Sequence, residues 1–377
     1  MNQPKRIALM TTLGRNVGDE FIREGILGFF DALGVEYDPY FVDKHDLSTL
    51  HARRKDELHP LTDKFADADV IVQCGAPVYW HNGKHRSYTA DWHNALWEDR
   101  IFKLSGAKVI LNLGAGAGQG SVDDLATMLD DATLCAFARA AGAACRVTTT
   151  RDPLASQFLH ALEVGHALLP CPAFHAALRF NAGRQFQPRD VLAVNLMPLA
   201  GHFKLKPETN PARWQQVIAE TLPILRRDHQ LVFVAHNPAE REFQESLCRG
   251  SEAVFYSDDY RDYLSIYARA KGIVSNRVHA AVVVAGFGRP AVLVGNDARL
   301  GIATPIGIPA ADSSVADAGW IVRSINEQLN DAHNIFIQRR ALQSDSARAY
   351  QIHLGEALNP LDAQSSRDTP ARLPCAA

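Results

Sequence analysis

The sequence predicts an α/β protein made of two successive βα domains that face a common cleft. Short β-rich runs alternate with amphipathic helical patterns, which is typical of parallel sheets covered by helices on both faces. At 377 residues the chain is also too long for one ordinary core. We expect an N-terminal Rossmann-like domain over 1–175, a C-terminal Rossmann-like domain over 176–356, and a polar, disordered tail over 357–377.

The first series of strands is predicted at 6–13, 37–43, 69–75, 107–114 and 145–150. Between the first two strands, apolar residues recur at helical spacing, at Phe21, Ile22, Ile26, Phe29, Phe30 and Leu33. The segment 171–190 has no clear period and is expected to join the two domains. The second series is predicted at 190–197, 230–237, 253–257, 272–276 and 290–296, with amphipathic helices such as 211–229 between the strands.

Charge and composition argue against several classes of function. The net charge of -3 and the pI near 6.6 leave no basic field for nucleic acid. No apolar run approaches the roughly 20 residues needed to cross a bilayer, and the N-terminus reads as a first strand rather than a signal peptide. The six cysteines are scattered, without a C-x-x-C pair or metal-like spacing, which indicates reduced thiols, no metal site and a cytoplasmic protein.

The junctions that follow the strands are the first places to look for a ligand. In open parallel sheets ligands bind beyond the carboxyl ends of strands, and the helix N-termini found there suit anions. After the first strand, "NVGDEF" places Asn16, Gly18 and Asp19 at a helix start, where a helix cap and an acidic first turn are an alternative explanation. The glycine-rich "LGAGAGQGS" fails the G-x-G-x-x-G spacing, which favours a turn that leads into a helix, with a backbone amide cradle for part of a ligand as the alternative.

Two arginines occupy the same kind of junction, one in each domain. Arg151 lies between a strand and a helix, and Arg277 with His279 opens the apolar run "SNRVHAAVVVAG". A cleft between the domains brings such junctions to face each other. Two guanidiniums there suit a dianionic small molecule, because Arg binds carboxylate and phosphate bidentately. The alternatives are that Arg151 pairs with a local carboxylate and that Arg277 and His279 only begin a buried helix.

Four segments, in order, resemble motifs of the polysaccharide pyruvyl transferase family over about residues 10–310. They are "NVGDEFI"; "ADADVIVQCGAPVYW", with Ala76 where a second glycine is usual; "TTTRDPLASQFL", with Ser156 in place; and "ARAKGIVSNRVHAAVVVAGFGRPAVLVGND", with Val278 for leucine and Pro290 where expected. The chain also departs from the family pattern at Arg299, near where the family often has lysine.

The resemblance implies a fold like that of the two-domain GT-B glycosyltransferases. It implies transfer of the pyruvyl group of phosphoenolpyruvate (PEP) to two hydroxyls of a sugar, in a polysaccharide or its lipid-linked precursor, with formation of a ketal. By motif match, PEP is held by Arg151, Arg277, the main chain of Val278 and His279. PEP is the donor substrate and no cofactor is implied. A lipid-linked acceptor leaves open a peripheral association with a membrane.

The residues suit this chemistry. Ketal formation begins with protonation of the methylene carbon of PEP, and His279 is the expected acid because histidine titrates near neutrality. A carboxylate near the acceptor takes the hydroxyl proton, and Asp19 is the expected base. Asn16 and Gly18 are expected beside it in the cleft.

The segment 78–100 is the expected acceptor side, since it holds three of the five tryptophans of the chain. Aromatic faces stack on the C–H surfaces of sugars. We expect an exposed loop that binds the sugar at Tyr79, Trp80 and His81, while anchoring of the later tryptophans in the core is an equally good interpretation of those residues. His236 is expected either to point into the cleft or to cap the next helix.

Two other functions fit a protein of this architecture. The first is a GT-B glycosyltransferase that uses a nucleotide sugar, for which "SDDY" at 257–260 offers a carboxylate to grip ribose or, equally, a helix start. The second is a non-catalytic carbohydrate-binding protein of polysaccharide assembly. The intact arginines and histidine of the junctions argue against a decayed site.

Overall fold

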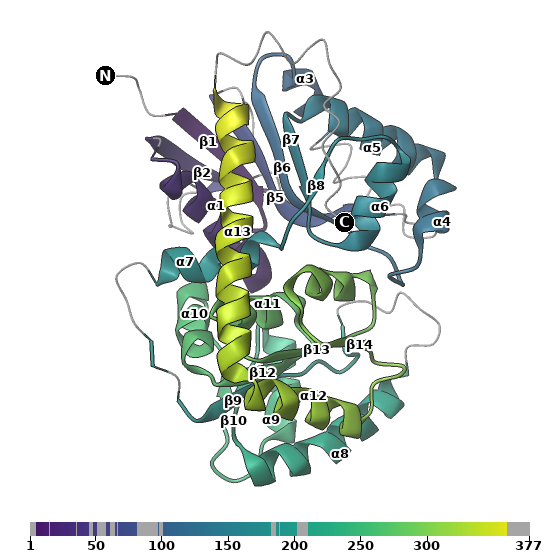
Figure 1. Cartoon of the computed structure of the whole chain (residues 1–377), viewed down its shortest axis with the longest axis vertical. Coiled ribbons are helices and arrows are strands. Elements are labelled where there is room, and N and C mark those ends of the chain that lie inside the picture. Colours follow the sequence, from purple (N-terminus) through teal and green to yellow (C-terminus); the bar gives the residue numbers. More distant parts are fainter. Residues whose placement is uncertain are drawn as a thin grey trace.

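The computed structural model has two sheets flanked by helices, one above the other in Figure 1. It describes residues 5–14, 16–34, 36–44, 48–50, 58–60, 65, 67–80, 97, 101–181, 186–187, 189–201 and 210–359. The predicted α/β class with two βα sheets is confirmed. Within the described residues, no helix is both long enough and apolar enough to cross a membrane.

The first sheet has the strand order β4-β3-β2-β1-β5-β6-β7-β8. The six strands from β2 to β8 in this order pair in parallel, and β3 and β4 extend the β2 edge in antiparallel fashion. The strands are β1 (Lys5–Thr11), β2 (Tyr37–Asp43), β3 (Ser48–Leu50), β4 (Leu58–Pro60), β5 (Val70–Tyr79), β6 (Val109–Ala117), β7 (Val147–Thr150) and β8 (Ala167–Leu168). The helices of this part are α1 (Val17–Ala32), α3 (Phe102–Leu104), α4 (Leu125–Leu129), α5 (Ala132–Ala144) and α6 (Pro153–Ala161).

The second sheet has the order β11-β10-β9-β12-β13-β14 and all its pairs are parallel. Its strands are β9 (Val191–Asn195), β10 (Gln230–Val234), β11 (Val254–Phe255), β12 (Gly272–Ser275), β13 (Ala291–Gly295) and β14 (Ala310–Asp312). Its helices are α8 (Pro211–Asp228), α9 (Pro238–Leu247), α10 (Tyr260–Arg269), α11 (Val278–Gly286), the 3-10 helix η3 (Ala298–Ile306) and α12 (Ala318–Asn330). Residues of β13 and α11 are buried almost without exception, as expected for elements covered on both sides.

The chain between the sheets forms the 3-10 helix η2 (Pro172–His175) and α7 (Ala176–Phe180). The backbone of η2 packs directly on α11, because a Cβ atom at Gly286 would lie 2.2 Å from the carbonyl oxygen of Phe174. On its other side η2 contacts α1. This short segment therefore brings α1 of the first sheet and α11 of the second sheet together, with their N-termini on the same side.

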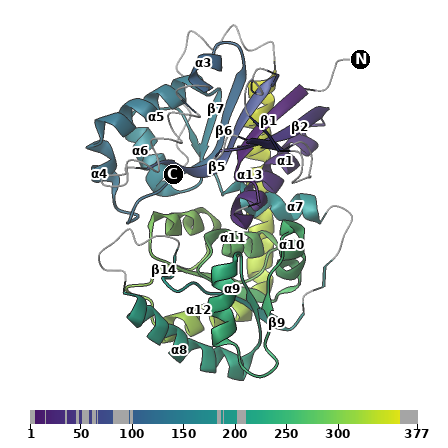
Figure 2. The ribbon, with the colours of Figure 1, turned by 180° about the vertical axis from the view of Figure 1, so that it is seen from behind.

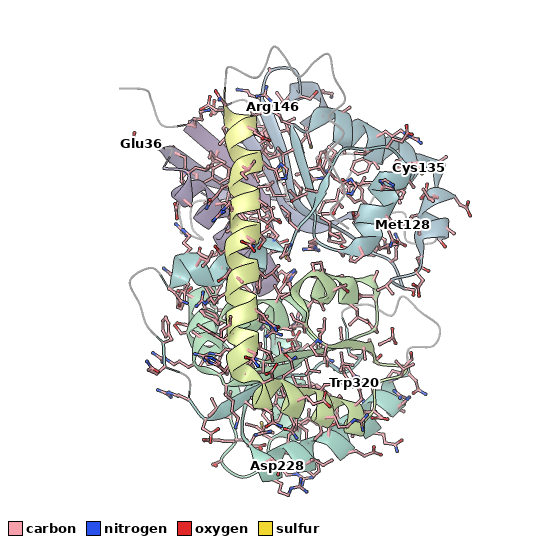
Figure 3. The ribbon with its side chains drawn as sticks, in the orientation of Figure 1. Glu36, Met128, Cys135, Arg146, Asp228 and Trp320 are labelled. Atoms are coloured by element: carbon pink, nitrogen blue, oxygen red, sulfur yellow. The ribbon has the colours of Figure 1, made fainter. Side chains whose placement is uncertain are left out.

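The last helix, α13 (Ala332–Leu358), runs along both sheets (Figure 1) and is seen behind them in Figure 2. Near its middle, Gln343 donates to the carbonyl oxygens of Phe174 and Gly286, at 2.7 and 3.0 Å. Near its end, Arg146 of the first domain donates to the carbonyl oxygen of Ala357 at 2.9 Å, and Figure 3 labels Arg146 at that end. The end of the helix thus packs on the N-terminal domain. Of the tail expected over 357–377, Ala357 and Leu358 are instead the buried last residues of α13, and the residues from 360 onward lie outside the described part of the chain.

Candidate active site

The carboxyl ends of strands from both sheets meet at one cleft, which holds about 640 Å³ of empty space, open solvent included. Residues of the first domain that line it are Asn16, Gly18, Asp19, Pro77 and Arg151. Residues of the second domain that line it are Ala200, Gly201, His236, Asn276, Arg277, Val278, His279, Gly295, Asn296, Asp297, Arg299 and Leu300. The strand-end rule for open sheets therefore accounts for this site in both halves of the chain.

The structure brings together the predicted residues of the strand-end junctions, from Asn16 to Asp19, at Arg151, at His236 and from Arg277 to His279. Tyr79 and Trp80, the described residues of the expected sugar-binding loop, do not line the cleft. Tyr79 is the last residue of β5 and is fully buried, with its hydroxyl accepting from the amide of Asn112 at 3.2 Å, so its expected place in an exposed loop is wrong.

Trp80 follows Tyr79, is half-buried and packs against Gly118 rather than lining the cleft. His81 lies outside the described residues. Of the tryptophans farther along that segment, Trp97 is buried against Phe102 and Phe137, which agrees with the core-anchoring interpretation.

Arg151 follows β7 and is 1% exposed. One guanidinium nitrogen, Nη1, lies 3.3 Å from Nε2 of His279, and Nε has no hydrogen-bond partner in the described part of the chain. The predicted alternative of a local carboxylate partner is wrong, because the neighbouring Asp152 caps α6 and accepts from the main-chain N–H groups of Ala155 and Ala117 instead. Burial outweighs these hydrogen bonds and the charge of Arg151, and raises the pKa of Asp152 to about 6.

His279 lies in the first turn of α11 and faces the start of α1. A Cβ atom at Gly18 would lie 2.3 Å from Nδ1 of His279, so the two helix N-termini approach this closely only because residue 18 is a glycine. Burial, followed by the charge of Arg151, lowers the pKa of His279 to about 3 against the opposing charge of Asp19. A guanidinium can only donate, which makes Nε2 the acceptor and the ring neutral. The structure therefore places a neutral imidazole at His279 and not the expected imidazolium.

Asp19, in the first turn of α1, is buried and already engaged. Its Oδ2 accepts from the Lys44 ammonium at 2.8 Å and from the Thr12 hydroxyl at 2.5 Å. Burial alone would raise the pKa of Asp19, but the charge and hydrogen bond of Lys44 together with the hydroxyl of Thr12 hold that pKa well below its usual range. A carboxylate of such low pKa is a weak proton acceptor. The expected role of Asp19 as the general base is thus not supported.

Arg277 is the N-cap residue of α11, but its side chain makes no capping hydrogen bond and instead pairs with Glu240 of α9. Nε donates to Oε1 of Glu240 at 2.7 Å, and Nη2 donates to the same oxygen. Both side chains are buried, with 9% of Arg277 and 3% of Glu240 exposed. Arg299 behaves similarly, since its Nε and Nη2 donate to the two carboxylate oxygens of Asp297 at 2.9 and 2.5 Å. Among the three cleft arginines, Arg151 alone forms no ion pair with a carboxylate of the described residues.

His236 lies after β10 and lines the cleft as expected. Its Nε2 is 2.6 Å from the hydroxyl of Tyr267, and burial followed by the charges of Arg277 and His279 lowers its pKa well below the usual value. Capping of α9 is done by the next residue, Asn237, whose side chain accepts from the main-chain N–H of Glu240 at 2.8 Å.

Sequence reasoning missed two kinds of residue. Arg299 and its neighbours follow β13, so the junction rule that found Arg277 also applied to "GNDARL". Lys44 and Glu240 lie behind the cleft wall, and their pairing with Asp19 and Arg277 has no signature in the sequence. Among the described residues, no group of His, Cys, Asp or Glu is arranged to hold a metal ion.

The family model for polysaccharide pyruvyl transferase matches residues 16–298. This range includes all the cleft residues except Arg299 and Leu300. The chain belongs to this family. A search of curated proteins with this chain finds no significant match.

Solved structures similar to this family member have the same two-domain fold at low sequence identity. A UDP-GlcNAc 2-epimerase from Neisseria meningitidis, bound to UDP-GlcNAc, has a TM-score of 0.56 at 11% identity, with 94% of this chain and 99% of that chain covered. The S. aureus MnaA–UDP structure has a TM-score of 0.53 at 11% identity, with 98% and 100% covered. A putative UDP-N-acetylglucosamine 2-epimerase from Listeria monocytogenes has 0.51 at 11%, with 98% of each chain covered. The fold is therefore of the GT-B type.

Proposed function

We propose that the protein transfers the pyruvyl group of PEP to two hydroxyls of one sugar, in a polysaccharide or its lipid-linked precursor, and forms a cyclic ketal. Membership of the polysaccharide pyruvyl transferase family supports the proposal. The observation that carries it is Arg151, whose buried guanidinium reaches the cleft without a carboxylate partner among the described residues. A buried cation of this kind is stabilised by an anionic ligand.

PEP brings a phosphate and a carboxylate, which need more than one cationic contact. Arg151 offers donors from the first domain, and Arg277 and Arg299 lie across the cleft on the second domain. The start of α11 adds main-chain N–H groups and the positive end of the helix dipole, so that Val278 contributes through its backbone. The donor site is thus completed only when both domains contribute.

The reaction transfers atoms in a simple order. A proton adds to the methylene carbon of PEP and leaves an oxocarbenium-like centre at C2. The first sugar hydroxyl attacks C2 and loses its proton, the C2–O bond to phosphate breaks, and the second hydroxyl closes the ring as it loses its proton. The products are the ketal and inorganic phosphate.

His279 is the proposed proton donor, and substrate binding is what charges it. In the structure its Nε2 accepts from Arg151. When an anionic oxygen of PEP takes the N–H groups of Arg151, Nε2 is released, and the negative charge of PEP raises the pKa of the ring. PEP therefore supplies both the carbon that is protonated and the negative charge that raises the pKa of His279.

For the acceptor, the proposal uses the side of the cleft formed by the first domain. Asn16 caps α1 and, with Gly18 and Pro77, lines this side. Trp80 lies three residues after Pro77 in the chain. Because Asp19 is a weak base, its proposed role is to form the ion pair that neutralises Lys44. The acceptor hydroxyl therefore gives its proton to another group or to the departing phosphate.

A ligand panel tests the proposal. PEP at saturating concentration should raise Tm, while UDP-GlcNAc and other nucleotide sugars should not, because ligand binding to the folded state raises apparent stability. Phosphate should be released from PEP only when a saccharide acceptor is added. A Tm rise with a nucleotide sugar and none with PEP would instead favour a glycosyltransferase, and binding of saccharide alone would favour a carbohydrate-binding protein.

A further inference from the structure

We infer that Glu240 is a positioning residue of the donor site: its carboxylate holds the guanidinium of Arg277 in the orientation in which Arg277 binds the anionic donor. The inference rests on the proposed function, because it takes PEP as the donor. Glu240 does not line the cleft and nothing in its sequence context marks it as functional, since an acidic residue in a first turn is ordinary.

The carboxylate of Glu240 collects donors from the ends of three neighbouring strands. Oε1 accepts from Nε and Nη2 of Arg277, which follows β12. Oε2 accepts from the main-chain N–H of His236 at 2.9 Å, after β10, and lies 3.4 Å from the side-chain amide nitrogen of Asn195, at the end of β9. Arg277 and His236 line the cleft, and Asn195 ends the strand between theirs. One carboxylate therefore links the ends of the three strands on the second-domain side of the cleft.

The main chain of Arg277 is fixed as firmly as its side chain. Its N–H donates to Oδ1 of Asn195 at 3.0 Å and to the hydroxyl of Ser275 at 2.9 Å. The Ser275 hydroxyl in turn donates to the carbonyl oxygen of Arg277 at 2.9 Å. With the backbone held at one end and the guanidinium at the other, the long side chain of Arg277 loses little further conformational freedom when a ligand binds.

The charge of Glu240 separates a positioning role from a purely electrostatic one. A buried carboxylate behind the wall of an anion site repels the ligand, so electrostatics alone predicts that its removal tightens the binding of PEP. Positioning predicts the reverse, because Arg277 without Glu240 loses the two hydrogen bonds that orient its guanidinium at the cleft wall. The sign of the change in affinity therefore decides between the two roles.

The experiment measures the Kd of PEP by calorimetric titration for the wild type and for Glu240→Gln. We expect the Kd to rise about 10- to 100-fold, the range of a charge-assisted hydrogen bond. Glu252→Gln is the matched control, because Glu252 forks Arg226 at 2.8 and 2.7 Å in the same domain and neither residue lines the cleft. This control should lose stability but keep the Kd of PEP.

Two further variants show whether Glu240 acts through Arg277. The double variant Glu240→Gln, Arg277→Gln should bind PEP no more weakly than Arg277→Gln alone, since coupled residues are non-additive. If Glu240→Gln does not fold, Glu240→Asp serves in its place: it keeps the charge but withdraws the carboxylate from Arg277, and should also weaken binding. Equal or tighter binding of PEP by the folded Glu240 variants would overturn this inference alone. Absence of saturable PEP binding by the wild type would overturn the proposed function and, with it, this inference.

Discussion

Nη1 of Arg151 lies 3.3 Å from Nε2 of His279, although the two residues are 128 positions apart and follow strands of different sheets. This contact joins the two halves of the cleft. Because Arg can only donate, it also assigns the imidazole tautomer, with Nε2 as the acceptor. The residue that faces the candidate acid from the other domain thus adds to the effect of burial in lowering the pKa of His279.

The first prediction concerns the titration of His279. In the ligand-free protein its ring should stay neutral from pH 8 down to about pH 4, because burial and the charge of Arg151 lower its pKa to about 3. Arg151→Gln removes one of the two largest causes and should raise the pKa, although burial keeps it below the unperturbed value. Histidine NMR signals followed through a pH titration give both values. A wild-type ring that protonates near pH 6.5 would contradict the contact.

The second prediction concerns PEP affinity. Arg151→Lys keeps a charge at the cleft but loses the planar fork, so it should raise the Kd of PEP by roughly 10- to 100-fold. The melting temperature without ligand should change little or rise, since Nε of the buried wild-type guanidinium has no hydrogen-bond partner among the described residues. Titration calorimetry and thermal melting on the same samples check both parts. A Kd equal to that of the wild type would exclude Arg151 from the donor site.

The third prediction separates the charge-pairing role of Asp19 from a catalytic one. Asp19→Asn leaves Lys44 buried without its partner and should cost about 3–5 kcal/mol of unfolding free energy, well above the roughly 0.3–1 kcal/mol of a helix-dipole effect alone. Asp19→Asn combined with Lys44→Met should recover most of that loss. Urea denaturation measures all three proteins. A loss below 1 kcal/mol in the single variant would show that the ion pair contributes little.

The fourth prediction concerns acid stability. His175 on η2 is 1% exposed, and burial lowers its pKa to about 3. The unfolded chain takes up this proton near pH 6.5 and the folded chain does not, so the unfolding free energy falls as pH drops from 6.5 toward 3, by up to about 1.4 kcal/mol per pH unit for this group. Between pH 8 and pH 5, His175→Gln should therefore lose about 2 kcal/mol less than the wild type. Equal losses in the two proteins would rule out His175 as a source of the pH dependence.

The fifth prediction concerns Ala76, which stands where the family usually has a second glycine. Its φ is 128°, in a region that favours glycine. Ala76→Gly should raise the unfolding free energy by about 1 kcal/mol, because relief of strain exceeds the added entropy of the unfolded chain. Ala115, its partner on β6 and equally buried, has an ordinary φ, so Ala115→Gly should destabilise instead. Thermal melts that order the two variants the other way would exclude strain at Ala76.

Much of the fold follows from local pattern. The long strands of both sheets and helix α1 show periodic apolar residues. Helix α1 also has a capping signal at Asn16, whose side chain accepts from the N–H of Gly18. Strands β3, β8 and β14, with two or three residues each, are too short to show alternation. Strand β5 was expected to end at 75, but it continues through the positive-φ pair Gly75 and Ala76 to Tyr79.

The site likewise contains residues that local sequence pattern predicts and residues that it does not. Arg151, Arg277 and His279 were predictable because a strand followed by a helix places its junction at the sheet edge wherever the sheet lies. The partners of these residues were not. Whether Arg277 meets Glu240, or Asp19 meets Lys44, depends on how elements far apart in the chain pack, and each of these residue types is common on a protein surface.

Helix α13 has a consequence for the order in which the protein is assembled on the ribosome. Its Tyr350 stacks on Phe29 at 4.3 Å and donates to the carbonyl oxygen of Pro170, and its end meets Lys5 and Arg146 of the first domain. The N-terminal domain, translated first, therefore lacks part of its cover until the codon for Leu358 has been read. A nascent chain stopped after the first sheet should expose the apolar face around Phe29 and bind chaperones, since incomplete domains leave such surface open.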